Sequence, residues 1–212
     1  MSETWLTLQR GGIVMIPLIL CSIIALGIII ERAIALRKKR VLVPAIINLI
    51  ETIHNPNDIH LALSICQKNK GVFANIVQLG LENRQLPKDE LKELITDQGR
   101  QEVRELEKGL SVLETIAGIA PLLGLLGTVS GMIKVFSVIS QMGLGQTQAL
   151  SGGISEALIT TVVGLSIGIP VLVCYNYFTN KAESLILDIE KFTSILLRKL
   201  GEFQMNGDAS LR

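Results

Sequence analysis

Three long, strongly apolar stretches of this chain contain no charged residue, and they constrain its fold more than any other feature. They comprise residues 11–30, 115–133 and 157–180. A helix rises 1.5 Å per residue, so about 20 residues cover the roughly 30 Å hydrocarbon core of a bilayer. We therefore predict three transmembrane helices. The alternative, three helices buried in a soluble core, is disfavoured by the absence of charge over such lengths.

The composition agrees with a membrane protein. Hydrophobic residues make up 49% of the 212 residues and charged residues 18%, below the quarter or so typical of soluble domains. The formal net charge is +1, so nothing indicates a nucleic acid or an acidic substrate. The first stretch exceeds the apolar core of a signal peptide, about 7–15 residues, and Glu31 and Arg32 follow it without a small-residue cleavage site. We expect it to be a retained anchor.

The basic sequence Arg37-Lys-Lys-Arg40 follows the first span directly, and the positive-inside rule places that end of the span in the cytoplasm. The predicted organisation is a short periplasmic N terminus at 1–10, transmembrane helix 1 at 11–32, a cytoplasmic helical region at 33–110, transmembrane helix 2 at 111–139, a periplasmic loop at 140–153, transmembrane helix 3 at 154–180 and a cytoplasmic helical tail at 181–212.

The predicted fold class is all-α, an integral membrane protein with three transmembrane helices. Helices two and three extend into the cytoplasm and form a homo-oligomeric bundle. Apolar residues recur at helical spacing through the charged segment from 93 to 113, so we expect that helix to continue unbroken into the second span.

Small residues gather on one face of helix two and one face of helix three. Such stripes allow membrane helices to approach closely, because lipid supplies no hydrophobic drive for their association. They can pack helix two on helix three within one chain. Because each contains a threonine, they can also line a narrow water path. The stripes are Ala117, Ala120, Gly124, Thr128 and Gly131 on helix two, and Gly153, Ala157, Thr161, Gly164 and Gly168 on helix three; Gly127/Gly131 and Gly164/Gly168 are also spaced as small-xxx-small pairs.

Glu156 is the only charged residue from Val135 to Asn180, and it lies one turn before Thr160 on the same helix face. Ionisable residues in spans are costly and usually face a bundle interior or a water path. The alternative is a carboxylate that reaches the membrane interface. Lys134, toward the outer end of helix two, could pair with Glu156 or repel cations at a pore mouth.

Nothing in the sequence indicates a metal, a cofactor or an enzyme. Cys21, Cys66 and Cys174 show neither a disulfide framework nor metal spacing, and His54 and His60 have no Cys or second His pair nearby. The spans contain no Asp, no His and no paired carboxylates, and the cytoplasmic segment has no nucleotide-binding glycine loop.

The chain resembles the MotA/TolQ/ExbB family of proton-channel subunits, most closely its three-span TolQ/ExbB branch. The specific combination is a Pro-x-x-Gly-x-x-Gly-Thr-Val core followed downstream by Gly-Ile-x-Glu-Ala-Leu. The resemblance rests on Glu107-Lys-Gly-Leu110, on residues 116–132 (IAGIAPLLGLLGTVSGM), on residues 153–164 (GISEALITTVVG), and on Ile169-Pro170 and Tyr175-Asn176.

The resemblance implies a homo-oligomer, a pentamer in this branch, in the inner membrane of a Gram-negative type of cell. Helices two and three would line its pore. A single-span partner of the ExbD/TolR type would place an Asp there, and a TonB/TolA-type protein could join the assembly. The coupling ion would be H⁺, and no cofactor is implied. The resemblance implies that Thr128 and Thr161 line the pore and that Glu156 is the glutamate of helix three. From the residue pattern we add Thr160 to the ion pathway, Lys134 as a candidate pore-mouth modulator, and five glycines that pack the helices of the pore wall: Gly124, Gly127, Gly131, Gly164 and Gly168.

Two departures from the family pattern stand out. Ser130 occupies a position where the family often has an aromatic residue, and Lys134 replaces an uncharged polar one. The second function class is a structural scaffold that assembles partners without conducting ions. The sequence leaves open Na⁺ against H⁺ coupling, the TolQ, ExbB or motility-type assignment, and the process that is energised: TonB-dependent import, envelope maintenance or motility.

Overall fold

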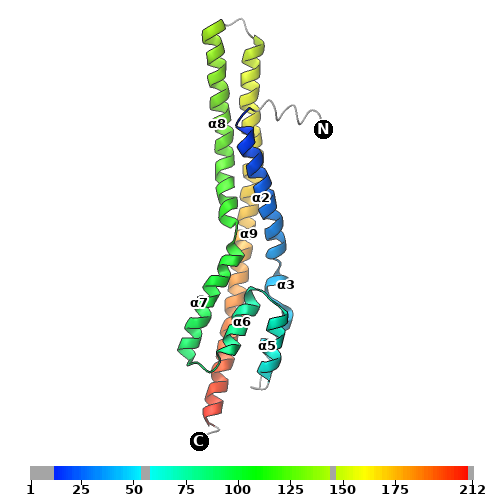
Figure 1. The fold of residues 1–212 in the computed structure, drawn as a ribbon, viewed down its shortest axis with the longest axis vertical. Helices are drawn as coiled ribbons and strands as arrows, with labels where there is room; N and C mark the ends of the chain where they lie inside the picture. The colour runs from blue at the N-terminus through cyan, green and yellow to red at the C-terminus, as the bar shows by residue number, and fades with distance from the viewer. Residues whose placement is uncertain (1–11, 54–57, 144–146, 210–212) are drawn as a thin grey trace. The chain divides into compact units, whose positions relative to one another are not determined.

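The computed structural model describes residues 12–53, 58–143 and 147–209, and the predicted periplasmic N terminus at 1–10 lies outside these ranges. Within them the chain contains helices and no strand, which confirms the all-α class (Figure 1). The helices are α2 (Met15–Ala35), α3 (Lys38–Val41), α4 (Pro44–Thr52), α5 (Ile59–Lys68), α6 (Val72–Glu82), α7 (Lys88–Glu107), α8 (Leu110–Met142) and α9 (Thr147–Ala209).

Helices α2, α8 and α9 are long and apolar enough to cross a membrane, as predicted. Their most apolar 18-residue windows have mean hydropathies of 2.3, 1.9 and 2.3. Many large apolar side chains on them are exposed in the single chain, among them Ile16, Leu122 and Val162. Lipid or neighbouring membrane helices must cover these side chains, because water would not favour such a surface. Helix α8 ends at Met142 and helix α9 begins at Thr147, so residues 140–142 and 147–153 of the loop predicted at 140–153 are helical.

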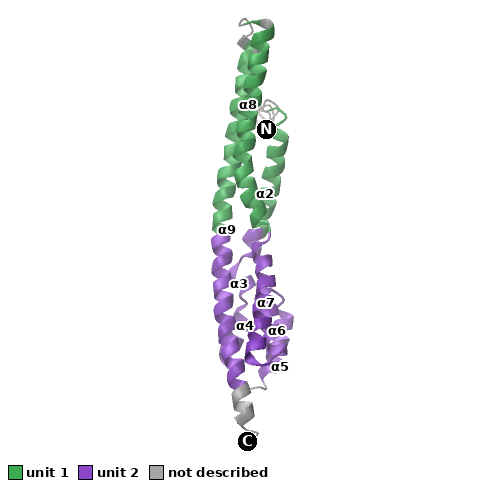
Figure 2. Ribbon diagram, turned by 90° about the vertical axis from the view of Figure 1, so that its left-hand side faces the viewer, with its two compact units in different colours: residues 1–31, 109–177 green, residues 32–108, 178–212 purple. Residues whose placement is uncertain are grey.

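The chain divides into two compact units (Figure 2). Unit 1 comprises residues 1–31 and 109–177, and unit 2 comprises residues 32–108 and 178–212. In unit 1, α8 and the first part of α9 lie side by side, with α2 beside them (Figure 1). Met15 and Leu18 of α2 form a buried cluster with Ala120 of α8. The first span is therefore held to the other two by a small apolar contact.

The expected continuous helix from 93 to 113 is wrong at one point. Helix α7 ends at Glu107 and α8 begins at Leu110. Gly109 between them has φ +75°, in the left-handed region. Only glycine adopts this conformation without a steric cost to a side chain. The break was not predicted, because a helix usually tolerates a single glycine within a charged helical pattern.

Replacing Gly109 with alanine should destabilise the chain by about 1–2 kcal/mol, because a left-handed backbone brings Cβ too close to the following carbonyl. The new Cβ would also lie 3.1 Å from Cγ2 of Ile28. The melting temperature of detergent-solubilised protein measures the effect. Gly118→Ala is the control, since no side chain or other helix among the described residues lies within 4 Å of a Cβ there. Equal melting temperatures for the two variants would contradict the assignment.

In unit 2, short helices pack with the C-terminal part of α9. The rings of Phe73 and Phe192 lie 6.1 Å apart between centroids. Arg32, at the end of α2 and buried, donates from Nη1 to the carbonyls of Glu105 (3.0 Å) and Leu106 (3.3 Å). These contacts satisfy carbonyls in the last turn of α7, which have no partner within the helix. The largest fully buried side chains of this unit include Leu42, Ile46, Ile50, Phe73, Ile76, Leu81, Leu91, Leu185, Leu196 and Leu200.

Cys66 of α5 is 1% exposed, and burial raises the pKa of its thiol to about 11. Because the folded pKa lies above the usual value of about 8.5, the fold favours the neutral thiol. Its contribution to stability is complete below about pH 8.5 and disappears as the pH rises toward 11. We therefore expect iodoacetamide to label Cys66 slowly at pH 8 in folded protein and rapidly after unfolding. Mass spectrometry of both samples measures this, and equal labelling rates would contradict it.

Candidate ion-pathway site

The small residues of α8 and α9 bring the two backbones into direct contact. A Cβ built on Gly124 would lie 3.0 Å from the carbonyl oxygen of Thr160 and 3.1 Å from Cα of Thr161. A Cβ on Gly164 would lie 2.6 Å from the carbonyl oxygen of Ala120. These atoms belong to the backbone, so no side-chain movement can make room. The approach therefore requires glycine at position 164, and at position 124 a side chain would push the two backbones slightly apart.

The other three predicted glycines lie along the same contact. Gly131 faces Ala157 and the carbonyl of Gly153, and Gly168 faces the ring of Pro121. Gly127 receives the side chain of Thr160. All five therefore pack α8 on α9 within one chain, which is the arrangement that the sequence analysis weighed against a pore lining.

The contact differs from the predicted stripe at one position of α8. Gly127 packs against α9, whereas Thr128 is half-buried and donates its hydroxyl to the carbonyl of Leu125 at 2.6 Å. Two helices packed side by side meet at alternating spacings of three and four residues. That spacing matches the small residues of α8 at the contact: Ala117, Ala120, Gly124, Gly127 and Gly131. A helical wheel drawn with a fixed angle per residue does not reproduce it.

The two threonines of α9 have different surroundings. Thr160 is fully buried, and its hydroxyl donates to the carbonyls of Ala157 at 2.9 Å and Glu156 at 3.2 Å in its own helix. Thr161 is half-buried and donates across to the carbonyl of Gly124 on α8 at 3.1 Å. Thr161 thus places a hydroxyl at the seam between the two helices, where it can also meet water.

The carboxylate of Glu156 forms an ion pair with Lys134. The Nζ atom of Lys134 lies 2.5 Å from Oε1 of Glu156, so α8 and α9 are joined at this point by opposite charges. The Glu156 side chain is 17% exposed and that of Lys134 is 53% exposed. Pairing with Glu156, one of the two roles considered for Lys134, is formed in the structure, and repulsion of cations at a pore mouth stays a prediction.

Gly12 is a further neighbour of this pair and was not predicted from the sequence. It precedes α2 and has φ +67°, and a Cβ built on it would collide with the Glu156 carboxylate. The backbone before α2 therefore approaches the carboxylate closely. The sequence Gly11-Gly12 before the first span could have indicated a close backbone approach. Glycines are, however, common in turns of every kind, so this signal is weak. Glu156 thus lies where parts of α8, α9 and the segment before α2 meet.

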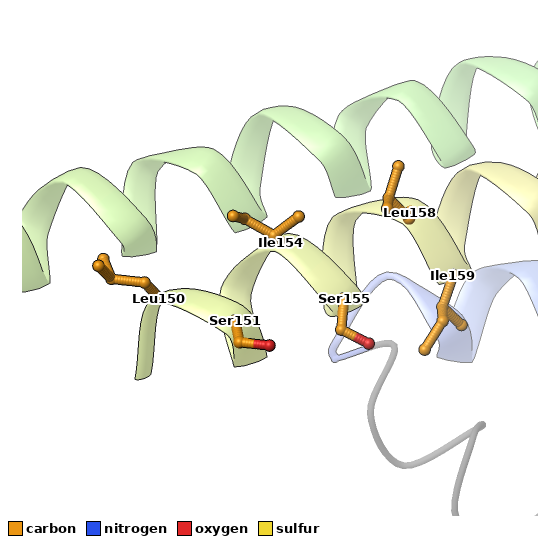
Figure 3. A pocket seen from close by; sticks show the side chains of 6 residues that line it. All are labelled: Leu150, Ser151, Ile154, Ser155, Leu158 and Ile159. Atoms are coloured by element: carbon orange, nitrogen blue, oxygen red, sulfur yellow. The ribbon is translucent and has the colours of Figure 1, made fainter. Parts of the chain in front are cut away.

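An open groove of about 520 Å³ runs along α9 near this site. Its lining contains no charged side chain, and Figure 3 shows the side chains that form it: Leu150, Ser151, Ile154, Ser155, Leu158 and Ile159. Among the residues that the structure describes, no group of three or more His, Cys, Asp or Glu could hold a metal ion. The chemistry available at the site is that of hydroxyls, carbonyls and one ion pair.

A family model described as the MotA/TolQ/ExbB proton channel family matches residues 68–191, more than half of the chain. The chain belongs to this family. The region that matches the MotA/TolQ/ExbB model contains both membrane helices of the α8–α9 contact. It includes Thr128, Lys134, Glu156, Thr160 and Thr161.

Relatives within the MotA/TolQ/ExbB family include ExbB and TolQ proteins. The putative biopolymer transport protein ExbB-like 3 of Synechocystis sp. is 33% identical over 180 residues, which cover 80% of this chain and 82% of that protein. ExbB of Aquifex aeolicus is 38% identical over 41% of this chain and 59% of its own length. TolQ of Haemophilus influenzae is 35% identical over 46% of this chain and 45% of its own length. The chain thus spans less than two thirds of the latter two proteins.

Proposed function

We propose that this protein is the pore-forming subunit of an inner-membrane motor driven by the proton motive force. Its N terminus would be periplasmic and its C terminus cytoplasmic. It would act with a single-span partner of the ExbD/TolR type, and TonB/TolA-type proteins would be further partners. The energised process would be TonB-dependent import or envelope maintenance. Membership of a proton channel family and the names of the relatives support this reading.

The observation that carries the proposal is the environment of Glu156. It is the only charge between residues 135 and 180, it is mostly enclosed, and it lies beside a helix seam that contains the Thr161 hydroxyl. A charged group inside a span is expensive unless water or a counter-charge serves it. Lys134 supplies one counter-charge, and a hydrated path along α8 and α9 of neighbouring subunits would supply water to the pair. The exposed apolar surfaces of these helices are available for association.

In this mechanism the chain supplies threonine hydroxyls and a helix surface of small residues, and the partner supplies the titrating Asp. The hydroxyls of Thr128 and Thr161 would turn from the carbonyls of Leu125 and Gly124 to donate to the charged Asp, whereas a neutral Asp slides past the small residues. One charge crossing the membrane is worth about 2.3 kcal/mol per 100 mV. A few protons per step therefore exceed the roughly 1–2 kcal/mol of a hydrogen bond in a membrane.

The second candidate function is a structural scaffold, and one observation favours it. All five glycines are accounted for by packing of α8 on α9 within one chain, without any pore. In a scaffold, Thr161 merely joins the two helices through its bond to Gly124. The two functions differ in whether ion flux depends on the hydroxyls.

The test removes both hydroxyls and measures proton flux in liposomes that contain the chain with its membrane partner. Thr128→Ala/Thr161→Ala should lower the flux by at least about tenfold, equivalent to roughly 1.4 kcal/mol in the barrier. Thr115→Ala is the matched control, because its exposed hydroxyl donates to the Ser111 carbonyl at 2.8 Å in the same helix. Unchanged flux in an assembled double variant would refute the proposed role of the hydroxyls.

A further inference from the structure

The basic residues that follow α2 have a second basic segment beside them in the fold. Arg37, Lys38, Lys39 and Arg40 are all exposed, while the adjacent Val41 and Leu42 are buried and hold the segment in place. A Cβ on Gly71 would lie 3.8 Å from the carbonyl oxygen of Arg40. The sequence before Gly71 contains Lys68 and Lys70, both exposed. The fold therefore brings a second basic segment beside the first.

Most of these charges have no acidic partner. Lys38 is paired with Asp188 of α9 at 2.7 Å. Within residues 12–53, 58–143 and 147–209, no ion pair is formed by Arg37, Lys39, Arg40, Lys68 or Lys70. We call these five residues the basic cluster. Five unneutralised, exposed cations on two adjoining segments of unit 2 repel one another and favour a site rich in anions.

The cluster starts only two residues after the end of a membrane span, since α2 ends at Ala35. Its first member therefore lies at the level where phospholipid headgroups begin. Basic residues immediately beyond a transmembrane helix are attracted by the negative surface potential of an anionic leaflet. We propose that the basic cluster binds the headgroups of anionic phospholipids, with Lys68 and Lys70 extending the site beyond the residues that set the topology. This inference does not depend on ion conduction.

The test measures the association of spin-labelled phosphatidylglycerol and spin-labelled phosphatidylcholine with the full chain in dioleoylphosphatidylcholine vesicles. Wild type should prefer phosphatidylglycerol. Removing a basic residue at an anionic surface lowers an association constant by up to about fivefold, so Lys68→Gln/Lys70→Gln should lose several-fold of the preference. This variant leaves the positive residues after α2 unchanged, so altered membrane insertion would not explain the loss. Lys39→Gln/Arg40→Gln should lose a similar amount.

A matched control removes the same charge elsewhere in unit 2. Lys88→Gln/Lys92→Gln lies at the start of α7, whereas Arg32 at the end of α2 contacts Glu105 near the other end of α7. Lys88 and Glu105 are about 25 Å apart along a helix. The control should keep the full preference. Raising KCl from about 0.1 M to about 1 M should reduce the wild-type preference, because the Debye length falls from about 10 Å to about 3 Å.

Three outcomes would overturn the inference. The first is equal association of the two lipids with wild type. The second is a preference that the control loses as strongly as the cluster variants do. The third is a preference abolished by 10 mM inorganic phosphate at constant ionic strength, which would indicate a site for a free anion rather than the membrane surface.

Discussion

Replacing Gly164 with valine should prevent α8 and α9 from packing and should leave little folded protein. Even the first added carbon would lie 2.6 Å from the carbonyl oxygen of Ala120 and 3.0 Å from Cα of Gly124. Because both are backbone atoms, the helices themselves must separate. Overpacking of a well-packed core costs about 1–3 kcal/mol, and here the whole seam is displaced. Gly164→Ala should already lower the melting temperature clearly.

The measurement is the yield and melting temperature of each variant in detergent, read by size-exclusion chromatography after heating. Gly27→Ala is the control, because Gly27 is a helical glycine of α2 and, in the part of the chain that the structure describes, no side chain or other helix lies within 4 Å of a Cβ there. It should match or exceed wild type, since alanine favours a helix by about 1 kcal/mol over glycine. A Gly164→Val protein as stable as Gly27→Ala would show that the α8–α9 contact is wrongly placed.

The Lys134–Glu156 pair should respond unequally to loss of its two members. Lys134→Gln leaves a carboxylate that is only 17% exposed without its counter-charge, whereas Glu156→Gln leaves an ammonium that is 53% exposed. Lys134→Gln should therefore destabilise the chain by about 1–3 kcal/mol, a value between those of exposed and buried ion pairs. Glu156→Gln should cost less than about 1 kcal/mol. A double-mutant cycle read by melting temperature gives the coupling between the two.

The two variants should rank in the opposite order for proton flux, with Glu156→Gln the more damaging. Glu156→Gln removes the charged group of the proposed pathway, so flux should fall by at least about tenfold, or roughly 1.4 kcal/mol in the barrier. Lys134→Gln removes a cation near the path, so flux should rise by about fivefold for an interaction of roughly 1 kcal/mol. If stability and flux changed in parallel in both variants, the pair would be structural only.

The membrane spans were predictable because their signal is local. An uncharged and strongly apolar stretch of about 20 residues has few other uses, and charge placement together with apolarity identified the regions of α2, α8 and α9. The break at Gly109 was not predictable, because the energy that favours it includes the contacts of Arg32 with the carbonyls of Glu105 and Leu106, far away in sequence.

The sequence pointed to the ion pair but not to the arrangement around it. The charge pattern singled out Glu156, and Lys134 was expected either to pair with it or to repel cations at a pore mouth. The structure forms the pair, and the roles of both residues in ion flow stay predictions. The presence of Gly127 rather than Thr128 in the contact between α8 and α9 depends on how two helices wind around each other. The approach of Gly12 to the carboxylate depends on a third segment. Neither follows from one helix considered by itself.

The measurement that tests the central proposal most directly is ion flux through the wild-type chain, co-purified with its single-span partner and reconstituted in liposomes. An imposed pH gradient or membrane potential should drive proton flux, and exchange of Na⁺ for K⁺ should leave that flux unchanged. Flux that requires the partner and is carried by protons is the predicted result. An assembled, partner-bound complex that conducts no ion while it still supports its process in cells lacking a proton motive force would contradict the proposal and establish the scaffold.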